Sequence, residues 1–202
     1  MKKRLAISIC VSFVLWYIML NPLMGLQEFF WQSMALSSIT LFLMAYCWGE
    51  MKFELTFKQV GLGILLAAVL WGIFWTGDKL SSLMFDFADS QVDSIYSMGE
   101  KMPKWAITIQ LLVLTGPAEE LFWRGYVQKQ LSTIFKPFVG FLITLGVYTL
   151  IHVWSLNFML VMAAMVAGAV WGFLYYLKPS WLPALIISHA LWDATVFSIF
   201  PY

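Results

Sequence analysis

Charged residues are scarce in this sequence: only 11% of its 202 residues are Asp, Glu, Lys or Arg. Soluble globular domains contain about 25% charged residues, so this deficit excludes an ordinary soluble domain. The net charge of +1 provides no electrostatic attraction for nucleic acid, and we expect no nucleic-acid partner. Both cysteines, Cys10 and Cys47, lie in apolar runs, so a disulfide framework is not indicated.

Hydrophobic residues make up 61% of the chain and its mean hydropathy is +0.81, values typical of a membrane protein. Seven apolar runs are long enough to cross the hydrocarbon core, which is about 30 Å thick and takes roughly 20 residues. They lie near 5–24, 28–48, 58–76, 104–131, 137–154, 156–177 and 181–200. We predict an all-α, polytopic transmembrane helical bundle of about seven spans in a lipid bilayer, with 1–202 as a single integral membrane domain.

The N-terminal Met-Lys-Lys-Arg and the apolar run after it resemble a signal peptide, but no small-residue cleavage site follows, so we expect an uncleaved first helix. Basic residues mark the cytoplasmic ends of membrane spans. With the N-terminus inside, nine basic residues lie at inner ends and three at outer ends. The inner ones are Lys2, Lys3, Arg4, Lys52, Lys58, Arg124, Lys129, Lys136 and Lys178, and the outer ones are Lys79, Lys101 and Lys104. We therefore predict a cytoplasmic N-terminus and an external loop at 77–103 that contains an interfacial helical piece.

Two adjacent carboxylates, Glu119 and Glu120, lie inside the apolar run at 104–131. Ionisable side chains in hydrocarbon cost at least a few kcal/mol each and usually line a polar cavity with a function. Glu120 and Arg124 are four residues apart, so they share a helix face and can pair. Glu119 is turned about 100° away and has no partner at that spacing, which makes it a candidate general base.

Both histidines of the chain also lie in apolar runs, each with a polar residue four positions away. Tyr148 precedes His152 by one helical turn, and Asp193 follows His189 by one turn. A lone transmembrane histidine is often only a helix-to-helix hydrogen bond, and Tyr148 is expected to pack or donate a hydrogen bond. Asp193 can have the structural role of orienting His189.

The positions of Glu119, His152 and His189 along their predicted helices indicate that these side chains lie at similar depths in the membrane and can meet. Glu119 and His152 flank the turn predicted at 132–136, and at about 1.5 Å per residue both stand roughly 21–24 Å from it. His189 is about 16 Å beyond Lys178 on the same scale. We expect one polar layer within the bilayer that opens toward the cytoplasmic side.

Glu119-Glu120-x-x-x-Arg124, then Tyr148-x-x-x-His152, then His189-x-x-x-Asp193 occur in this order on successive predicted spans. This ordered trio resembles the CPBP family, which contains CAAX prenyl proteases of the Ras-converting-enzyme type and bacteriocin-processing or self-immunity (Abi) proteins. The resemblance covers about 104–200, which would be the catalytic core, with 1–76 as accessory spans. It implies an intramembrane endopeptidase.

The resemblance also implies a role for each motif residue. Glu119 would activate the attacking water, and His152 would hold and polarise that water. His189 and Asp193 would occupy the positions that stabilise the oxyanion, while Glu120 and Arg124 would support the site. Two residues depart from the family pattern, since Tyr148 replaces the more usual Phe and Asp193 stands where several members have Asn. An ionised Asp193 cannot donate to an oxyanion, so it would have to be protonated or act by orienting His189.

We expect a glutamic mechanism without a metal or other cofactor, because the sequence has no His-Glu-x-x-His motif and no histidine pair at helical spacing. A metalloprotease stays open as the alternative. Its zinc would be held by Glu119, His152, His189 and Asp193.

Two other functions compete with the protease. One is a non-catalytic membrane immunity or regulatory protein on the same scaffold, and the other is a small transporter with an acid–histidine proton relay, for which no inverted repeat is visible. The expected substrate is a membrane-associated peptide or protein. A sortase, bacteriocin, pheromone or sensor-system partner stays open, and the expected location is the plasma (inner) membrane.

Overall fold

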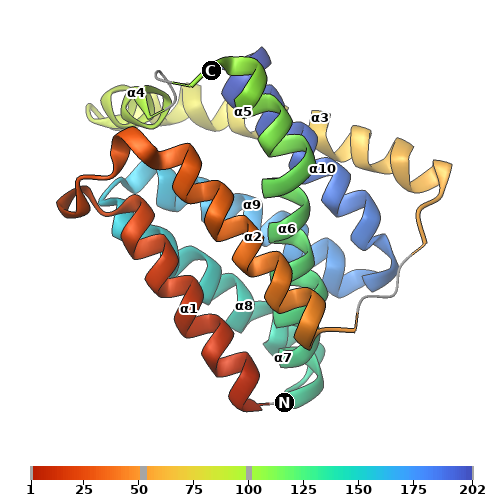
Figure 1. Cartoon of the computed structure of the whole chain (residues 1–202). Coiled ribbons are helices and arrows are strands. Elements are labelled where there is room, and N and C mark those ends of the chain that lie inside the picture. Colours follow the sequence, from red (N-terminus) through yellow and green to blue (C-terminus); the bar gives the residue numbers. More distant parts are fainter. Residues whose placement is uncertain (1, 51–53, 99–101, 202) are drawn as a thin grey trace.

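The computed structural model describes residues 2–50, 54–98 and 102–201, which form helices and short connections without a strand (Figure 1). The α-helices are α1 (Lys2–Leu20), α2 (Phe30–Trp48), α3 (Phe57–Met84), α4 (Ala88–Ser97), α5 (Lys104–Gln110), α6 (Gly116–Glu120), α7 (Lys129–Ile134), α8 (Pro137–His152), α9 (Phe158–Leu177) and α10 (Leu182–Ala194). Short 3-10 turns are η1 (Pro22–Met24), η2 (Gln27–Phe29), η5 (Val153–Ser155) and η6 (Pro179–Trp181). Three π-helical segments are η3 (Leu111–Thr115), η4 (Leu121–Gln128) and η7 (Thr195–Ile199). The predicted all-α polytopic bundle is confirmed.

Among the described residues, six helical stretches are long and apolar enough to cross a membrane. They are Lys2–Leu20, Gln27–Trp48, Phe57–Met84, Pro137–Ser155, Phe158–Leu177 and Pro179–Ile199. The run predicted at 104–131 is also helical, but it passes through five successive elements, α5, η3, α6, η4 and α7, none of which has the length of a span by itself. The remaining predicted spans match these helices closely, apart from the end of α3.

The boundary predicted after residue 76 is wrong, because α3 continues as a helix to Met84. Gly77 and Asp78 indicated a chain break, yet the side chains of Ser81 and Ser82 donate to the carbonyls of Gly77 and Asp78, one turn earlier. These bonds satisfy the two serine hydroxyls within the helix. The interfacial helical piece predicted within 77–103 is present as α4, while 99–101 lie outside the described residues.

The segment that carries Glu119 and Glu120 is α6, and π-helical turns, which are wider than α-helical ones, flank it on both sides. η3 precedes α6 and η4 follows it. Pro117 has no backbone N–H and cannot make the regular helical bond to the preceding turn, so the wider π-helical turn before α6 is expected. π-Helical turns re-aim side chains and occur frequently at functional sites.

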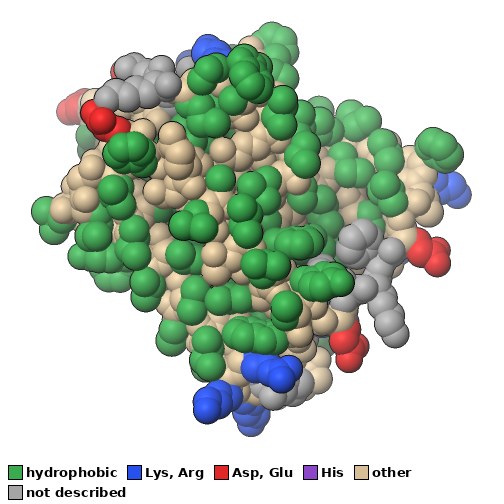
Figure 2. Space-filling view, viewed as in Figure 1, with side chains coloured by type: hydrophobic (Ala, Val, Ile, Leu, Met, Phe, Trp, Pro, Cys, Tyr) green, Lys and Arg blue, Asp and Glu red, His purple; other side chains and the backbone are tan. Residues whose placement is uncertain are grey.

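Apolar side chains cover much of the face seen in Figure 2, while charged side chains lie toward the periphery of this view. Exposed examples on four different helices are Leu36, Leu65, Val113 and Leu150. A soluble protein rarely exposes contiguous apolar surface on this scale, so this apolar surface is suited to contact with lipid.

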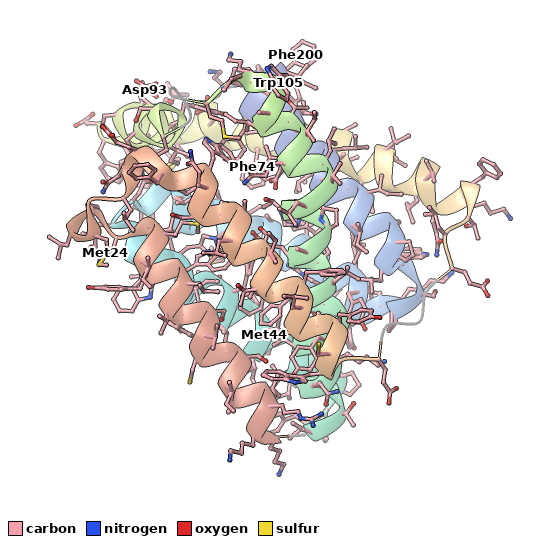
Figure 3. The ribbon with its side chains drawn as sticks, viewed as in Figure 1. Met24, Met44, Phe74, Asp93, Trp105 and Phe200 are labelled. Carbon is pink, nitrogen blue, oxygen red and sulfur yellow. The ribbon has the colours of Figure 1, made fainter. Side chains whose placement is uncertain are left out.

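The bundle has two distinguishable ends. At the basic end, near the N-terminus, Lys129 Nζ donates to the Glu50 carbonyl at 3.0 Å and Gln59 Nε2 to the Ser180 carbonyl at 2.7 Å. At the opposite end, which we call the distal end, α4 packs on the start of α9, and Asp93 and Phe200 lie on this side (Figure 3). Two lysines used to predict orientation, Lys52 and Lys101, lie outside the described residues.

Candidate active site

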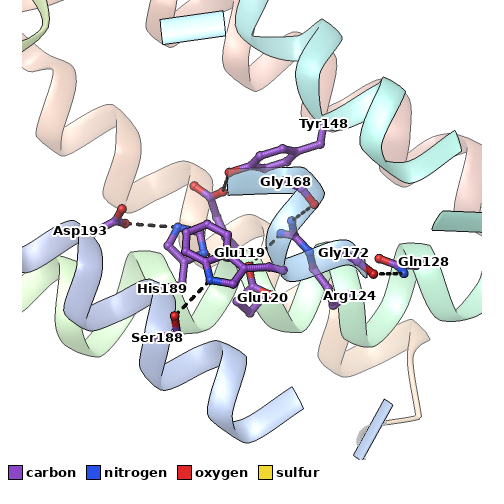
Figure 4. Close-up of polar contacts among 11 residues, drawn as sticks. Glu119, Glu120, Arg124, Gln128, Tyr148, Gly168, Gly172, Ser188, His189 and Asp193 are labelled. Atoms are coloured by element: carbon purple, nitrogen blue, oxygen red, sulfur yellow. Dashed lines mark hydrogen bonds and ion pairs between the residues drawn. The ribbon is translucent and has the colours of Figure 1, made fainter. Parts of the chain in front are cut away.

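Glu120 forms the centre of a fully buried ionic cluster (Figure 4). Its Oε1 accepts a hydrogen bond from Arg124 Nη1 at 2.8 Å, so the pair predicted from their spacing is present. The same oxygen accepts from His189 Nδ1 at 2.9 Å. Burying a charge without partners is expensive, and these contacts compensate Glu120 and connect α6 to α10.

Arg124, with 1% of its surface exposed, extends the cluster to α9. Its Nη2 donates to the Gly168 carbonyl at 3.2 Å, and one turn later Gln128 Nε2 donates to the Gly172 carbonyl at 2.8 Å. Gly168 is needed for this close approach, because a Cβ there would lie 2.8 Å from the Tyr148 ring. The guanidinium also lies 5.0 Å from the centre of the Tyr148 ring, a distance that permits a cation–π contact.

Glu119 makes none of these contacts and turns toward a cavity. Only 4% of its surface is exposed, and its Oε2 accepts a hydrogen bond from the Tyr148 hydroxyl at 3.1 Å. Helical spacing indicated no partner for Glu119, and the partner comes instead from α8. One carboxylate is therefore held inside the protein and the other faces open space.

Both ring nitrogens of His152 contact other parts of the protein. Nδ1 lies 2.7 Å from the Tyr148 carbonyl, which can only accept, so Nδ1 carries the hydrogen. Nε2 then accepts a hydrogen bond from the indole Nε1 of Trp16 at 3.2 Å. These two bonds define a neutral tautomer with the hydrogen on Nδ1, in which the lone pair on Nε2 accepts the Trp16 hydrogen bond.

His189 is held between two carboxylates. Nδ1 donates to Glu120, and Nε2 lies 3.3 Å from Asp193 Oδ2. Its ring stacks on Trp171 with ring centres 3.9 Å apart and planes 17° apart, and the indole of Trp171 donates to Ser188. The contact between His189 and Asp193 is the geometry expected if Asp193 orients the ring.

The predicted site residues line one cavity of about 350 Å³ inside the bundle. Its polar lining includes Glu119, Tyr148, His152, His189 and Asp193, together with Asp78, Ser81 and Thr115. Most of the remaining wall is apolar, with large side chains from several helices, including Trp16, Phe30, Trp31, Met34, Phe74, Leu160, Trp192 and Phe197. The groups predicted to meet thus line one cavity, although Glu120 and Arg124 lie behind its wall.

The cavity extends toward the distal end of the bundle. Its lining includes the last residues of α1, the first of α2, the end of α3, α4 and the start of α9. We predicted a cytoplasmic N-terminus together with an opening on the cytoplasmic side. This pair of predictions is inconsistent with the geometry, because the cavity opens away from the N-terminus. The physical reason is that His152 ends α8 at the distal end, with η5 directly after it.

Among the described residues, no group of three or more His, Cys, Asp and Glu side chains is arranged to hold a metal ion. The ring nitrogens of His152 face Trp16 and a backbone carbonyl, whereas those of His189 face Glu120 and Asp193. Two of the four alternative zinc ligands, His152 and His189, thus have both ring nitrogens directed at protein partners.

Two tryptophans in the site were not predicted, Trp16 against His152 and Trp171 against His189. Eleven tryptophans in an apolar chain carry no local signal that separates these two from packing residues. The Gly168-x-x-x-Gly172 spacing was a usable signal, because small residues four apart let membrane helices approach closely.

Comparison with known families supports the resemblance carried by these motifs. Residues 101–195 match the family described as type II CAAX prenyl endopeptidase, Rce1-like. This range contains every site residue predicted from the sequence. No curated protein and no solved structure matches the chain.

Proposed function

We propose that this chain, which belongs through residues 101–195 to the family of Rce1-like type II CAAX prenyl endopeptidases, hydrolyses a peptide bond in a membrane-associated peptide or protein through a water activated by Glu119. The family supports an intramembrane endopeptidase in general. The observation that carries the finer proposal is the Glu119 carboxylate, which is buried yet faces a cavity with space for a substrate. We treat 104–200 as the catalytic core of one membrane domain and the plasma membrane as its location.

In the proposed mechanism, Glu119 accepts a proton from a water as the water oxygen attacks the peptide carbonyl carbon. The tetrahedral intermediate then collapses as Glu119 returns the proton to the amide nitrogen and the C–N bond breaks, leaving a carboxylic acid and an amine. A positioned general base of this kind contributes about 10²–10⁴-fold to the rate. The hydrogen bond from Tyr148 fixes one Glu119 oxygen and leaves the other for the water.

The negative charge on the intermediate requires donors beside the cavity. We propose His189 for this role, with Asp193 orienting the ring, because the Nδ1 bond to Glu120 and stacking on Trp171 fix its position. Its donor to the intermediate is Nε2, so the 3.3 Å contact of Nε2 with Asp193 must lengthen when the intermediate forms. Asp193 is itself a donor only when protonated, and its 3.3 Å separation from His189 Nε2 favours the orienting role.

His152 is proposed to hold and polarise the attacking water. Its Nε2 accepts from Trp16 in this structure, so contact with the water requires that this bond lengthen or open. Trp16 also lines the cavity, which places the indole where an entering substrate would contact it.

The proposed mechanism uses no metal or other cofactor, and zinc held by Glu119, His152, His189 and Asp193 is the alternative. The pairing of both histidines with protein groups supports the first version. Retention of activity after chelation separates the two versions.

The decisive experiment is cleavage of a fluorogenic membrane-peptide library by the detergent-purified protein, beside Glu119→Gln and His152→Ala, each with and without a strong chelator. We expect cleavage by the unaltered protein that survives chelation and is lost in both variants. Loss on chelation with recovery on adding zinc would establish the metalloprotease instead. A well-folded protein that cleaves no library member would favour the non-catalytic immunity or regulatory function.

A further inference from the structure

We propose that the active-site cavity is entered from the side of the membrane opposite the cytoplasm, so that its substrates are apolar segments of peptides or proteins exposed on that side. This inference rests on the proposed function only in so far as the molecule that enters the cavity is called a substrate. It combines three observations, namely two adjoining cavities that lead from Glu119 toward the distal end, the polarity of their walls and the distribution of basic residues.

The path is formed by two adjoining cavities. The inner one, of about 350 Å³, contains Glu119, and a second of about 380 Å³ lies beyond it. Both are lined by Leu20, Ile95, Met98 and Leu160, so only these side chains stand between them. The second cavity, which we call the vestibule, lies between η1, η2, α4 and η5 at the distal end.

Polarity changes along this path. Beyond its five polar active-site groups, the inner cavity is walled mainly by apolar and aromatic side chains. The vestibule has a more polar wall, because Gln27, Glu28, Ser94, Ser97, Ser155 and Asn157 line it together with five apolar residues. A substrate that fills both would place an apolar segment inside and a hydrated, polar segment at the distal surface, because burying unpaired polar groups is costly.

The basic residues indicate which side of the membrane that surface faces. Of the described Lys and Arg residues outside the buried cluster, seven lie at the basic end: Lys2, Lys3, Arg4, Lys58, Lys129, Lys136 and Lys178. Lys79 and Lys104 lie at the distal end. Excess Lys and Arg close to span ends marks the cytoplasmic side. The vestibule therefore opens on the other side.

This orientation narrows the substrate class. A peptide tail confined to the cytoplasm could not reach the vestibule without crossing the bilayer. A translocated peptide, or a membrane helix whose end emerges on the non-cytoplasmic side, could present its apolar segment to Glu119 directly.

The test is cysteine accessibility in spheroplasts that express the full chain, with both native cysteines replaced through Cys10→Ser and Cys47→Ser. Single cysteines are then introduced in the vestibule by Ser97→Cys, in the inner cavity by Ala163→Cys, and at the basic end by Ser180→Cys. A small, charged, membrane-impermeant thiol reagent is added before or after membrane disruption. Labelling requires no proteolysis, so failure of this inference and failure of the proposed function are distinguished.

We expect Ser97→Cys and Ala163→Cys to label before disruption and Ser180→Cys only afterwards. The reverse pattern would overturn the proposal, as would equal labelling of both ends before disruption, which indicates mixed orientation. Labelling of Ala163→Cys only after disruption would also overturn it, because the cavity would then lack a path from the vestibule. Each variant is first checked for a single peak in detergent gel filtration, with Ser94→Cys and Thr133→Cys as substitutes for the two end positions.

Discussion

Glu119 and Glu120 are neighbours in sequence, but their contacts give them a different role each. Glu120 accepts from Arg124 and His189 behind the cavity wall, whereas Glu119 accepts one bond from Tyr148 and faces the cavity. The first arrangement compensates a buried charge, and the second leaves an oxygen able to take part in a reaction. Substitutions at these two positions should therefore damage different properties.

We predict that Glu119→Gln lowers cleavage by about 10²–10⁴-fold while leaving thermal stability close to that of the unaltered protein. Glu120→Gln should instead lower the free energy of unfolding by roughly 3–5 kcal/mol, because Arg124 loses its charged partner in a buried place. Cleavage rate and melting temperature in detergent measure the two effects. Equal loss of stability in both variants would contradict the division of roles.

We predict that Trp16→Phe acts specifically on His152, because it keeps a buried aromatic ring and removes only the N–H that contacts Nε2. Since the chain has only two histidines, ¹⁵N-histidine labelling reports both rings separately. The His152 Nε2 signal should move while the His189 signals stay, and kcat should change more than KM. Trp75→Phe, on the exposed face of α3, is the matched control and should move neither ring. An unchanged His152 spectrum would contradict this contact.

At the scale of elements, close helix contacts hold the reactive groups in register. α6 crosses α10 where Gly116 faces Ala190, three residues before Glu119 and one residue after His189. A Cβ on Gly116 would lie 2.7 Å from the Ala190 backbone, a distance that real Cβ atoms essentially never show. A methyl group there must push apart the two helices that carry Glu120 and His189.

We predict that Gly116→Ala destabilises the protein by roughly 1–3 kcal/mol through this overpacking. Gly146→Ala, also in a helix, is the control, because a Cβ there meets no described atom within 4 Å. That change should be neutral or stabilising by about 0.5–1 kcal/mol, since alanine favours a helix over glycine. Thermal unfolding in detergent measures both, and similar effects of the two substitutions would contradict the contact.

α4 covers the cavity and is tied to α9 by Asn157. The Asn157 Nδ2 donates to the Gln91 carbonyl and to Ser94, while its Oδ1 accepts from Leu160 N and caps α9. The side-chain oxygen of Gln91 in turn accepts a hydrogen bond from Met159 N. One amide therefore begins a helix and anchors the element that borders the vestibule.

We predict that Asn157→Asp separates these two functions, because a carboxylate still caps α9 but cannot donate to α4. The loss of two donated bonds should cost about 1–3 kcal/mol and speed amide hydrogen exchange in α4, with exchange at the start of α9 unchanged. Asn157→Ala, which removes both functions, should speed exchange in both helices. Unchanged exchange in α4 in both variants would show that other contacts hold it.

At the scale of the whole molecule, the cavity is lined by more of the chain than the family match covers. The match covers 101–195, but the cavity wall also takes Trp16 from α1, Trp31 from α2 and Phe74 from α3. α1 packs on α2, α8 and η5, and its Trp16 supplies the partner of His152. The N-terminal helices thus complete the site physically, although the predicted chemistry resides in the matched part.

We predict that a chain lacking residues 1–26 fails to form a stable, active protein, because the cavity loses one wall and His152 loses its donor. Co-expression of residues 1–26 as a separate fragment should restore both properties, since membrane helices can associate after independent insertion. Detergent gel filtration and library cleavage measure the two properties. Full activity of the shortened chain by itself would contradict the contribution of α1.

The sequence by itself determined what depends on composition and on neighbours within one helix. Scarce charge and long apolar runs predicted the helical membrane bundle, and an i,i+4 spacing predicted the Glu120–Arg124 pair, because backbone geometry alone brings such residues together. It also singled out the ionisable groups that line the cavity, since their cost in hydrocarbon makes them conspicuous.

Only the tertiary structure decided the partners that come from other helices and the direction in which the cavity opens. Tyr148 lies 29 residues from Glu119, His189 lies 69 from Glu120, and Trp16 lies 136 from His152. Such contacts depend on helix tilt, rotation and packing, which arise from the whole set of helices and leave no periodic signal in the chain. The position of the cavity toward the distal end follows from the same cause.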